Sequence, residues 1–332
     1  MSDDYSAGAR NAVRACLGIG GGDRVAIIED RGRADIARAI GREAEDAGAE
    51  VRSWVMEDVV ERPATEFPAA LAEEITGFRP TASFYVGEGM PGELAFRHPM
   101  RELLVGRLRC RHGHMIGISP EVMRDGMAGD YDEIYRTTRR VYDVVREART
   151  IEVRSPLGTD LRATFDPGWR WVSSDGRYRD PGQWGNLPEG EVFTAPKNVE
   201  GVLVGEEIGD HFAPRYGLLE APVRLHLTAG RVTRVECDDA ALAAELEAYL
   251  GQHPESNRAG EFAIGTNLGL TRVIGNFLQD EKFPGVHVAF GDPYGPETGA
   301  DWEAPSHVDV LATRTDVSVD GRPIMRAGRF LL

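Results

Sequence analysis

The sequence lacks any apolar stretch of about 20 residues, the length that a membrane-spanning helix requires. Its first residues, MSDDYSAGARNAV, are acidic and lack the apolar segment of a secretory signal. Only three cysteines are present, and no two of them form a Cys-x-x-Cys pair: Cys16, Cys110 and Cys237. Cysteines that are so few and so scattered predict reduced thiols rather than disulfides. These absences predict a cytoplasmic protein without a membrane partner.

The sequence also contains fewer basic residues than acidic ones. The chain has 38 Lys and Arg residues against 54 Asp and Glu residues, so its formal net charge is −16. Binding to nucleic acid depends on basic surfaces, so we expect no nucleic-acid partner. The GxSxG, HExxH and Walker A patterns are absent as well, which removes the motif-based reasons to expect a serine hydrolase, a zincin or a P-loop protein.

A glycine run at residues 18–22 (GIGGG) raises the possibility of a dinucleotide site. The dinucleotide fingerprint places its glycines after the first strand, where they open a helix. Here the glycines precede the first expected strand, as the end of a helix and a turn would. The residues after that strand include Glu29 and Asp30, whose carboxylates would repel a pyrophosphate. The sequence therefore argues against a dinucleotide site.

The first 150 residues alternate short apolar segments with segments of helical periodicity. Strands are expected at 25–28, 50–56, 83–86 and 115–118, and helices at 34–47, 69–75 and 131–149. Such alternation is typical of a parallel sheet covered by helices. We therefore predict an α/β domain with a parallel sheet over residues 1–150.

From residue 151 the pattern changes to short strands and turns. Strands are expected at 151–154, 161–165, 192–194, 201–204, 223–227 and 231–236, one helix at 240–250, and a closing hairpin after 316–319. The length of 332 residues accommodates two domains of ordinary size. We predict a mostly-β (α+β) domain over residues 151–332.

The residues with the clearest chemical meaning lie in this second domain, between residues 260 and 311. His307 and Asp309 are two apart in an apolar segment, so on a strand both side chains point to the same face. An imidazole and a carboxylate directed to one place suit a divalent cation. His287 lies in a similar segment, VHVAF, and can face the same place from a neighbouring strand. The alternative is that each histidine is a half-buried strand residue paired with a carboxylate.

Two glutamates have matching surroundings. Glu191 and Glu261 each follow a glycine and each begin a run of strand-forming residues. Either one alone would be an ordinary carboxylate at a strand end. Together with the histidines and the aspartate they complete a set of five candidate metal ligands: Glu191, Glu261, His287, His307 and Asp309. Three carboxylates and two imidazoles exceed the needs of one catalytic cation and match those of two, with one carboxylate shared. Two such cations can activate water against a carbonyl group.

Several nearby residues allow two interpretations. Tyr294, in the loop GDPYGP, is either a donor to a developing oxyanion or a loop aromatic packed on proline. The triplet 280–282 (DEK) is expected to be a solvated turn, with Glu281 as an alternative outer carboxylate or proton acceptor. His112 and His114 are expected at the surface. Three tryptophans could line a flat pocket or belong to the core: Trp169, Trp171 and Trp184.

At these residues the chain resembles the M29 (aminopeptidase T) family of metallopeptidases. The resemblance rests on the segments EVFTAP from Glu191, Gly260-Glu261, the run from His287 to Tyr294, and His307-x-Asp309. It implies that Glu191, Glu261, His287, His307 and Asp309 bind two divalent ions such as Zn, Co or Mn, and that Tyr294 acts in catalysis with the two glutamates. It also implies a homodimer and a short-peptide or other small-molecule substrate.

The same superfamily includes 2,5-dihydroxypyridine 5,6-dioxygenase, which the chain resembles in length. That resemblance implies a single Fe(II) held by two histidines and one carboxylate. Two of those ligands match His307 and Asp309, but the remaining histidine falls at Ala263, so the Fe(II) ligand set is incomplete unless His287 substitutes for it. The ligand set therefore favours a hydrolase with two cations, and a ring-cleaving Fe(II) dioxygenase is the alternative. A third, non-enzymatic interpretation is a binding domain that a metal stabilises.

Overall fold

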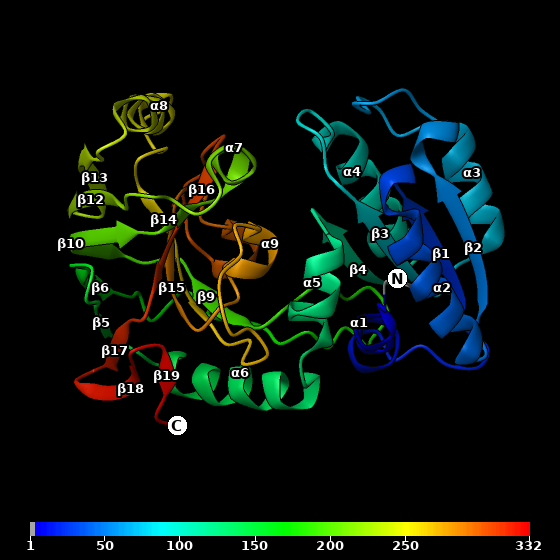
Figure 1. The fold of residues 1–332 in the computed structure, drawn as a ribbon, viewed down its shortest axis with the longest axis horizontal. Helices are drawn as coiled ribbons and strands as arrows, with labels where there is room; N and C mark the ends of the chain where they lie inside the picture. The colour runs from blue at the N-terminus through cyan, green and yellow to red at the C-terminus, as the bar shows by residue number, and fades with distance from the viewer. Residues whose placement is uncertain (1–3) are drawn as a thin grey trace. The chain divides into compact units, whose positions relative to one another are not determined.

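Two units make up residues 4–332, which the structure, a computed structural model, describes (Figure 1). The first unit contains the residues up to Tyr135 together with Gly176–Glu189, and the second contains Arg136–Asp175 together with Gly190–Leu332. The division falls within helix α6 (Tyr131–Val145). Residue 150, where the sequence changes its pattern, is the first residue of strand β5 (Thr150–Arg154) and belongs to the second unit.

A five-stranded parallel sheet lies at the centre of the first unit, in the order β2-β1-β3-β4-β8. Its strands are β1 (Arg24–Glu29), β2 (Glu50–Val55), β3 (Ala82–Gly87), β4 (Arg111–Ile116) and β8 (Trp184–Asn186). The predicted parallel sheet is confirmed. The predicted range of the fourth strand was wrong, because the strand begins at Arg111 rather than Met115. The fifth strand was not expected, because it comes from a segment far along the chain.

Helices cover both faces of this sheet. Successive residues of a strand point to opposite faces of the sheet, so Ile27 and Ile28 contact different helical layers. Ile28 packs in one apolar cluster with residues of α3 (Ala69–Phe78) and α4 (Leu94–Arg101), whereas Ile27 lies beside Gly41 of α2 (Ala34–Asp46). The unit also contains α1 (Ser6–Arg10) and α5 (Pro120–Arg124). Helix α1 continues as a π-helix over Asn11–Cys16, and α4 continues as a π-helix over Glu102–Arg107. The glycine run precedes β1, as the sequence indicates.

His112 and His114 contradict the expectation of surface residues. Both are buried on β4. Nδ1 of His112 lies 2.9 Å from the hydroxyl of Ser83, and its Nε2 lies 3.2 Å from Nδ1 of His114. Burial lowers the pKa of His112 to about 3, so the imidazole is neutral at physiological pH. The surrounding arginines in the sequence misled the interpretation, since the strand turns these two side chains inward.

A buried ion pair fixes the loops at one end of the parallel sheet. Glu93 is fully buried and accepts hydrogen bonds from the Arg62 guanidinium and from the backbone N–H groups of Ala64 and Met90, both at 2.9 Å. We expect Glu93→Gln to lower the thermal midpoint of unfolding by about 5 °C, because the buried guanidinium of Arg62 loses one of its carboxylate partners and keeps Asp30 and Glu57. Differential scanning calorimetry checks this. Asp35→Asn, which breaks an exposed pair with Arg38, should leave the midpoint unchanged.

The second unit is built from two antiparallel sheets. The larger has eight strands in the order β13-β12-β10-β6-β5-β17-β18-β19, and the smaller has six in the order β11-β16-β15-β14-β9-β7. The larger sheet contains β5, β6 (Asp160–Thr164), β10 (Asn198–Gly205), β12 (Val223–Thr228), β13 (Arg231–Glu236), β17 (Asp316–Val319), β18 (Arg322–Arg326) and β19 (Arg329–Phe330). The smaller contains β7 (Val172–Ser174), β9 (Glu191–Thr194), β11 (Glu207–Ile208), β14 (Ala259–Gly265), β15 (Gly285–Gly291) and β16 (His307–Thr313).

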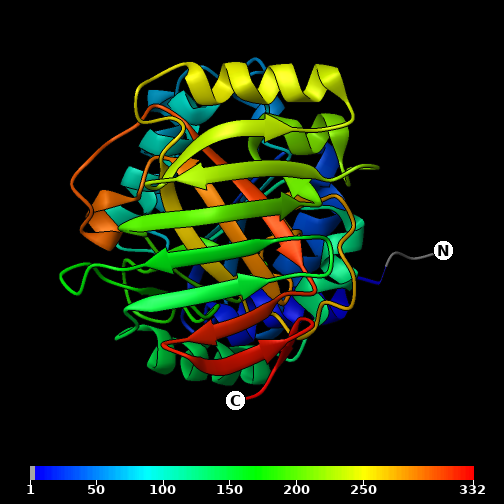
Figure 2. The ribbon, with the colours of Figure 1, turned by 90° about the vertical axis from the view of Figure 1, so that its left-hand side faces the viewer.

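The two sheets pack face to face and share one apolar core. Leu161 and Leu203 of the larger sheet lie in the same cluster as Val288 and Val310 of the smaller sheet. Figure 2 shows the strands of the smaller sheet crossing behind those of the larger one. The predicted helix at 240–250 is α8 (Ala240–Gly251). The strands expected at 223–227 and 231–236 pair as the hairpin β12–β13, and the predicted closing hairpin is β17–β18. Three short helices complete the unit: α7 (Ala213–Tyr216), α9 (Phe277–Asp280) and α10 (Gly295–Thr298).

No helix in the described range, 4–332, is both long and apolar enough to cross a membrane.

Candidate metal centre

The five candidate ligands lie on one face of the six-stranded sheet. Strand alternation explains this placement, because each of them has an apolar neighbour that points into the core between the sheets. His287 lies between Val286 and Val288, and Asp309 lies between Val308 and Val310. Glu261 is followed by Phe262, and Glu191 by Val192, in the same core. The structure therefore brings together all five residues that the sequence analysis selected.

Small residues beside the ligands give their side chains room. In the strand register, Ala289 lies between Glu261 on one side and Asp309 on the other. Ala263 is the direct neighbour of His287, and Gly265 is the neighbour of Glu191. Residues that are paired across antiparallel strands share a face. The acids can thus extend over alanine and glycine toward the histidines.

The two glycines that precede the glutamates are required by their surroundings. Gly190 has a φ of +130°, and a Cβ added there would lie 2.9 Å from the backbone nitrogen of Asn267. A Cβ added to Gly260 would lie 2.6 Å from the carbonyl oxygen of Gly291. Only glycine permits such close backbone approach. The Gly-Glu pattern in the sequence therefore reflects how β9 and β14 enter the sheet.

Glu261 faces both histidines. Its Oε1 lies 3.6 Å from Nε2 of His287, and its Oε2 lies 3.5 Å from Nε2 of His307. These separations exceed those of strong hydrogen bonds. They are close to the ~3.4 Å expected between two atoms that each lie about 2.1 Å from one ion at the tetrahedral angle. Each carboxylate oxygen of Glu261 is thus directed toward a different imidazole, as a bridging ligand requires.

His307 is held in the tautomer that a metal ligand needs. Its Nδ1 donates to the carbonyl oxygen of Asp292 at 2.9 Å, since a carbonyl can only accept. Once Nε2 loses its proton, as metal binding requires, its lone pair faces Glu261 and Oδ2 of Asp309, which is 3.5 Å away. Ligating histidines in metalloproteins are commonly fixed by such a backbone contact.

The cluster carries an excess of negative charge. Burial disfavours the charged form of both imidazoles, but the surrounding carboxylates outweigh it and raise the pKa of His287 to about 9 and that of His307 to about 10. Burial raises the pKa of Glu261 as well. The cluster therefore attracts positive charge, which either protons or metal cations can supply.

The donor atoms fall into three groups whose members lie within 4.8 Å of one another. The first group is Glu191, Glu261 and His287, the second is Glu261, His307 and Asp309, and the third is Glu281, His287 and Asp309. Oε2 of Glu191 and Nδ1 of His287 are buried without a hydrogen-bond partner among residues 4–332, so Glu191 retains a free oxygen for a ligand. Carboxylates and imidazoles in such groups are suitable ligands for divalent cations. The first two groups share Glu261, and none of the three contains both histidines.

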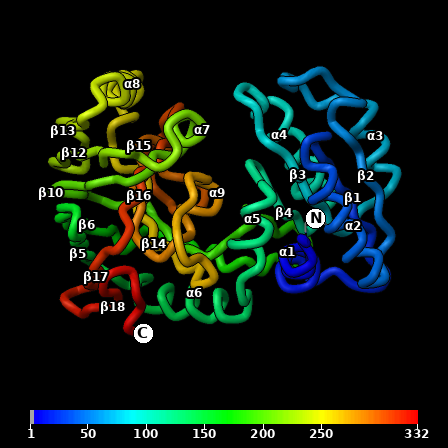
Figure 3. The backbone as a smooth tube through the Cα atoms, in the orientation of Figure 1, coloured from blue at the N-terminus to red at the C-terminus, as the bar shows by residue number. Residues whose placement is uncertain are grey.

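The triplet Asp280-Glu281-Lys282 is not a solvated turn, so that expectation was wrong. Asp280 is fully buried, and its Oδ2 accepts from the backbone N–H groups of Ile274, Gly275 and Asn276 at 2.8, 2.6 and 3.1 Å. This folds the segment between β14 and β15, visible in yellow and orange in Figure 3, onto itself. Lys282 is 1% exposed, and its Nζ lies 2.5 Å from Oε1 of Glu191 and 2.8 Å from Oε1 of Glu281.

Tyr294 lies at the edge of the cluster. Its ring centroid is 4.5 Å from that of His307, and its backbone has the left-handed φ of +51°, which is uncommon for a tyrosine. The residue is 39% exposed. Its phenol nevertheless has a pKa well above the ordinary value, because of the packing around it and the negative charge of Glu261 and Asp309. The hydroxyl is therefore protonated at neutral pH and can donate a hydrogen bond.

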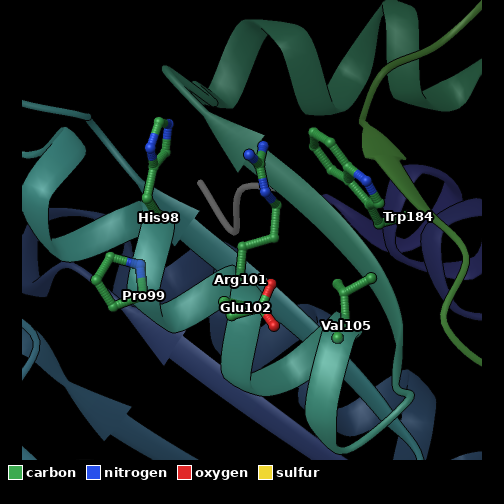
Figure 4. A pocket seen from close by; sticks show the side chains of 7 residues that line it. His98, Pro99, Arg101, Glu102, Val105 and Trp184 are labelled. Atoms are coloured by element: carbon green, nitrogen blue, oxygen red, sulfur yellow. The ribbon is translucent and has the colours of Figure 1, made fainter. Parts of the chain in front are cut away.

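The three tryptophans, for which the sequence allowed a flat pocket or a place in the core, have different surroundings. Trp171 lies in the core between the two sheets, and Trp169 packs against Trp302 at a centroid distance of 5.5 Å. Trp184 belongs to the first unit, where the Arg101 guanidinium lies 4.1 Å from its ring centroid. These two residues border a shallow pocket shown in Figure 4, lined by His98, Pro99, Arg101, Glu102, Val105, Gly106 and Trp184. It holds none of the candidate ligands.

Comparison with known proteins finds one family match and two solved structures that are similar over nearly the whole chain. Residues 115–264 match the family NicX, 2,5-dihydroxypyridine 5,6-dioxygenase. The structure of 2,5-dihydroxypyridine dioxygenase from Pseudomonas putida KT2440 is similar over 100% of this chain and 98% of its own, with a TM-score of 0.71 and 17% identity. AmpT from Thermus thermophilus is similar over 99% of each chain, with a TM-score of 0.72 and 20% identity. No curated protein sequence matches.

These matches agree with the motif resemblance: the chain has the fold of both proteins, and residues 115–264 match the dioxygenase family. At these identities the structural likeness shows the fold. The matched family segment includes Glu191 and Glu261 but ends before His287.

Proposed function

We propose that the protein is a metal-dependent hydrolase of the aminopeptidase type, acting on a short peptide or another small amide. The observation that carries the proposal is the position of Glu261, whose two carboxylate oxygens lie 3.6 and 3.5 Å from different imidazoles, while no group of donor atoms holds both histidines. A carboxylate that faces two imidazoles can be a ligand of two cations, whereas a mononuclear iron site of the oxygenase type needs two histidines around one ion.

Each residue of the cluster has a defined part in this proposal. Glu191, Glu261 and His287 would hold one cation, and Glu261, His307 and Asp309 the other. When bound, such cations supply Lewis acidity toward a carbonyl oxygen and lower the pKa of water. The Asp292 carbonyl keeps His307 oriented, and Tyr294 donates a hydrogen bond to the oxygen on which negative charge develops. Glu281, beside Lys282, is placed to accept a proton.

The second candidate function is a ring-cleaving dioxygenase that uses one Fe(II), on a small hydroxylated aromatic substrate. The match of residues 115–264 to the dioxygenase family favours it. Its weak point is Ala263, which pairs with His287 in the register and offers no ligand.

One pair of measurements separates the candidates. We expect elemental analysis of anaerobically purified protein to find up to two divalent cations per chain, and aminoacyl p-nitroanilides to be hydrolysed without oxygen uptake. A single iron together with oxygen consumption on dihydroxypyridines would establish the alternative instead. If the metal only stabilises a binding domain, Glu191→Gln will lower the thermal midpoint sharply and no turnover will be found.

The homodimer and the cytoplasmic location stay predictions. Light scattering can test the first of them.

A further inference from the structure

Lys282 is an unusual neighbour for a metal centre. It is one of only two lysines in the sequence, the other being Lys197. Lysine is rarely fully buried, yet here the side chain is 1% exposed and its ammonium contacts two carboxylates. The ammonium thus lies inside the cluster that is proposed to hold cations, and its positive charge must affect how they bind.

The ion pairs of Lys282 distinguish the donor groups. Glu191 belongs to the first group and Glu281 to the third, whereas neither partner belongs to the group of Glu261, His307 and Asp309. Lys282 takes Oε1 of Glu191, which leaves Oε2 facing Nε2 of His287 at 3.5 Å. The ammonium is therefore in direct contact with a ligand of the first group. Its charge also acts on Asp309 of the second group, but more weakly than the charges of His307 and His287 do.

Two opposing effects follow for the group that contains Glu191. By holding one oxygen, Lys282 fixes the orientation of the carboxylate, and such contacts typically improve metal affinity by about 10–100-fold. By carrying a full positive charge, it repels the cation. A pair of unit charges about 4 Å apart in a protein changes an equilibrium by roughly three powers of ten before relaxation, and a divalent ion doubles the interaction. The repulsion is therefore the larger effect.

We propose that Lys282 makes the two donor sets unequal: the set Glu261, His307 and Asp309 binds its cation first and tightly, and the set Glu191, Glu261 and His287 binds a second cation more weakly. Lys282 is a positioning residue in this scheme, since it acts through Glu191. The inference rests on the proposed function only in so far as the cluster binds divalent cations.

The test is a titration of the metal-free protein with Co²⁺, followed by calorimetry and by the absorption of the bound cobalt. We expect two binding steps whose affinities differ by at least about tenfold. Lys282→Met keeps the length of the side chain and removes the charge, so it should tighten the second step by about tenfold or more and the first step by less. Lys282→Arg keeps the charge and should keep two unequal steps. The matched control is Lys197→Met, at the exposed pair with Asp166, which should titrate like the wild type.

Two equal steps in the wild type, or a weaker second step in Lys282→Met, would overturn the inference. Should Lys282→Met fail to fold, as judged by its circular dichroism, Glu191→Gln decides: losing only the weaker step supports the proposed order, and losing the tighter step refutes it. Absence of any Co²⁺ binding would instead refute the metal centre itself, so the two failures are distinguishable.

Discussion

Replacing Glu261 with glutamine is expected to weaken cation binding at both donor sets, by at least about 100-fold each. The reason is the position of its two oxygens, which face different histidines at 3.6 and 3.5 Å. Glutamine has the same shape but lacks the charge and offers one weak oxygen donor. Calorimetric titration with Co²⁺ measures the effect, and hydrolysis of an aminoacyl p-nitroanilide should fall by a similar factor or more.

The matched control for this prediction is Glu191→Gln. Glu191 belongs to one of the two sets that share Glu261, so its replacement should remove one cation and leave the other bound. Glu261→Gln removes one buried carboxylate from a crowded negative cluster and should not destabilise the metal-free protein. Glu191→Gln also removes an ion-pair partner of the buried Lys282, so its metal-free form should be less stable, and circular dichroism checks that it is folded before the titration. A Glu261→Gln variant that still binds one cation with the wild-type affinity would show that Glu261 does not bridge.

The ligand set was predictable because strand alternation makes it visible. His307 and Asp309 are two apart, and His287 lies between two valines, so one face of each strand could be assigned without a structure. The glycines before Glu191 and Glu261 were a second usable signal. What the sequence does not contain is the strand order, which places β9 beside β14 and β14 beside β15. That order brings Glu191 within 3.5 Å of His287 although 95 residues separate them.

Lys282 and Asp280 were missed because a run of three charged residues ordinarily lies in solvent. The signal that could have found Lys282 is the scarcity of lysine: a chain with 38 basic residues uses arginine at all but two of these positions. His112 and His114 were missed for the opposite reason, since the flanking arginines suggested a surface. Here the alternation within β4 and the hydroxyl of Ser83 on β3 decide the burial, and the latter is a long-range contact.

Glu207→Gln is expected to stabilise the protein at pH 8 and to have little effect at pH 5. Glu207 lies on β11 and is 0% exposed, and its carboxyl group is close enough to that of Asp280 to share a hydrogen bond when one of the two is protonated. Burial, and next the negative charge of Asp280, raise the pKa of Glu207 well above its ordinary value. At neutral pH the carboxyl is therefore protonated in the folded protein and ionised in the unfolded chain.

The sign of the pH effect follows from proton binding. Above the ordinary pKa of a glutamate, roughly 4.3, the folded state binds one more proton at Glu207 than the unfolded state does, so the free energy of unfolding falls as pH rises. The loss is about 1.4 kcal/mol per pH unit until the folded carboxyl ionises. Glutamine does not titrate, so the variant escapes this loss and should be more stable by about 2–4 kcal/mol at pH 8. Thermal unfolding of metal-free protein between pH 5 and pH 8 measures the difference, with the exposed Glu220→Gln as a control that should follow the wild type. A Glu207→Gln variant less stable than the wild type at pH 8 would mean that the carboxyl is ionised in the folded protein, with a positive group near it that keeps it so.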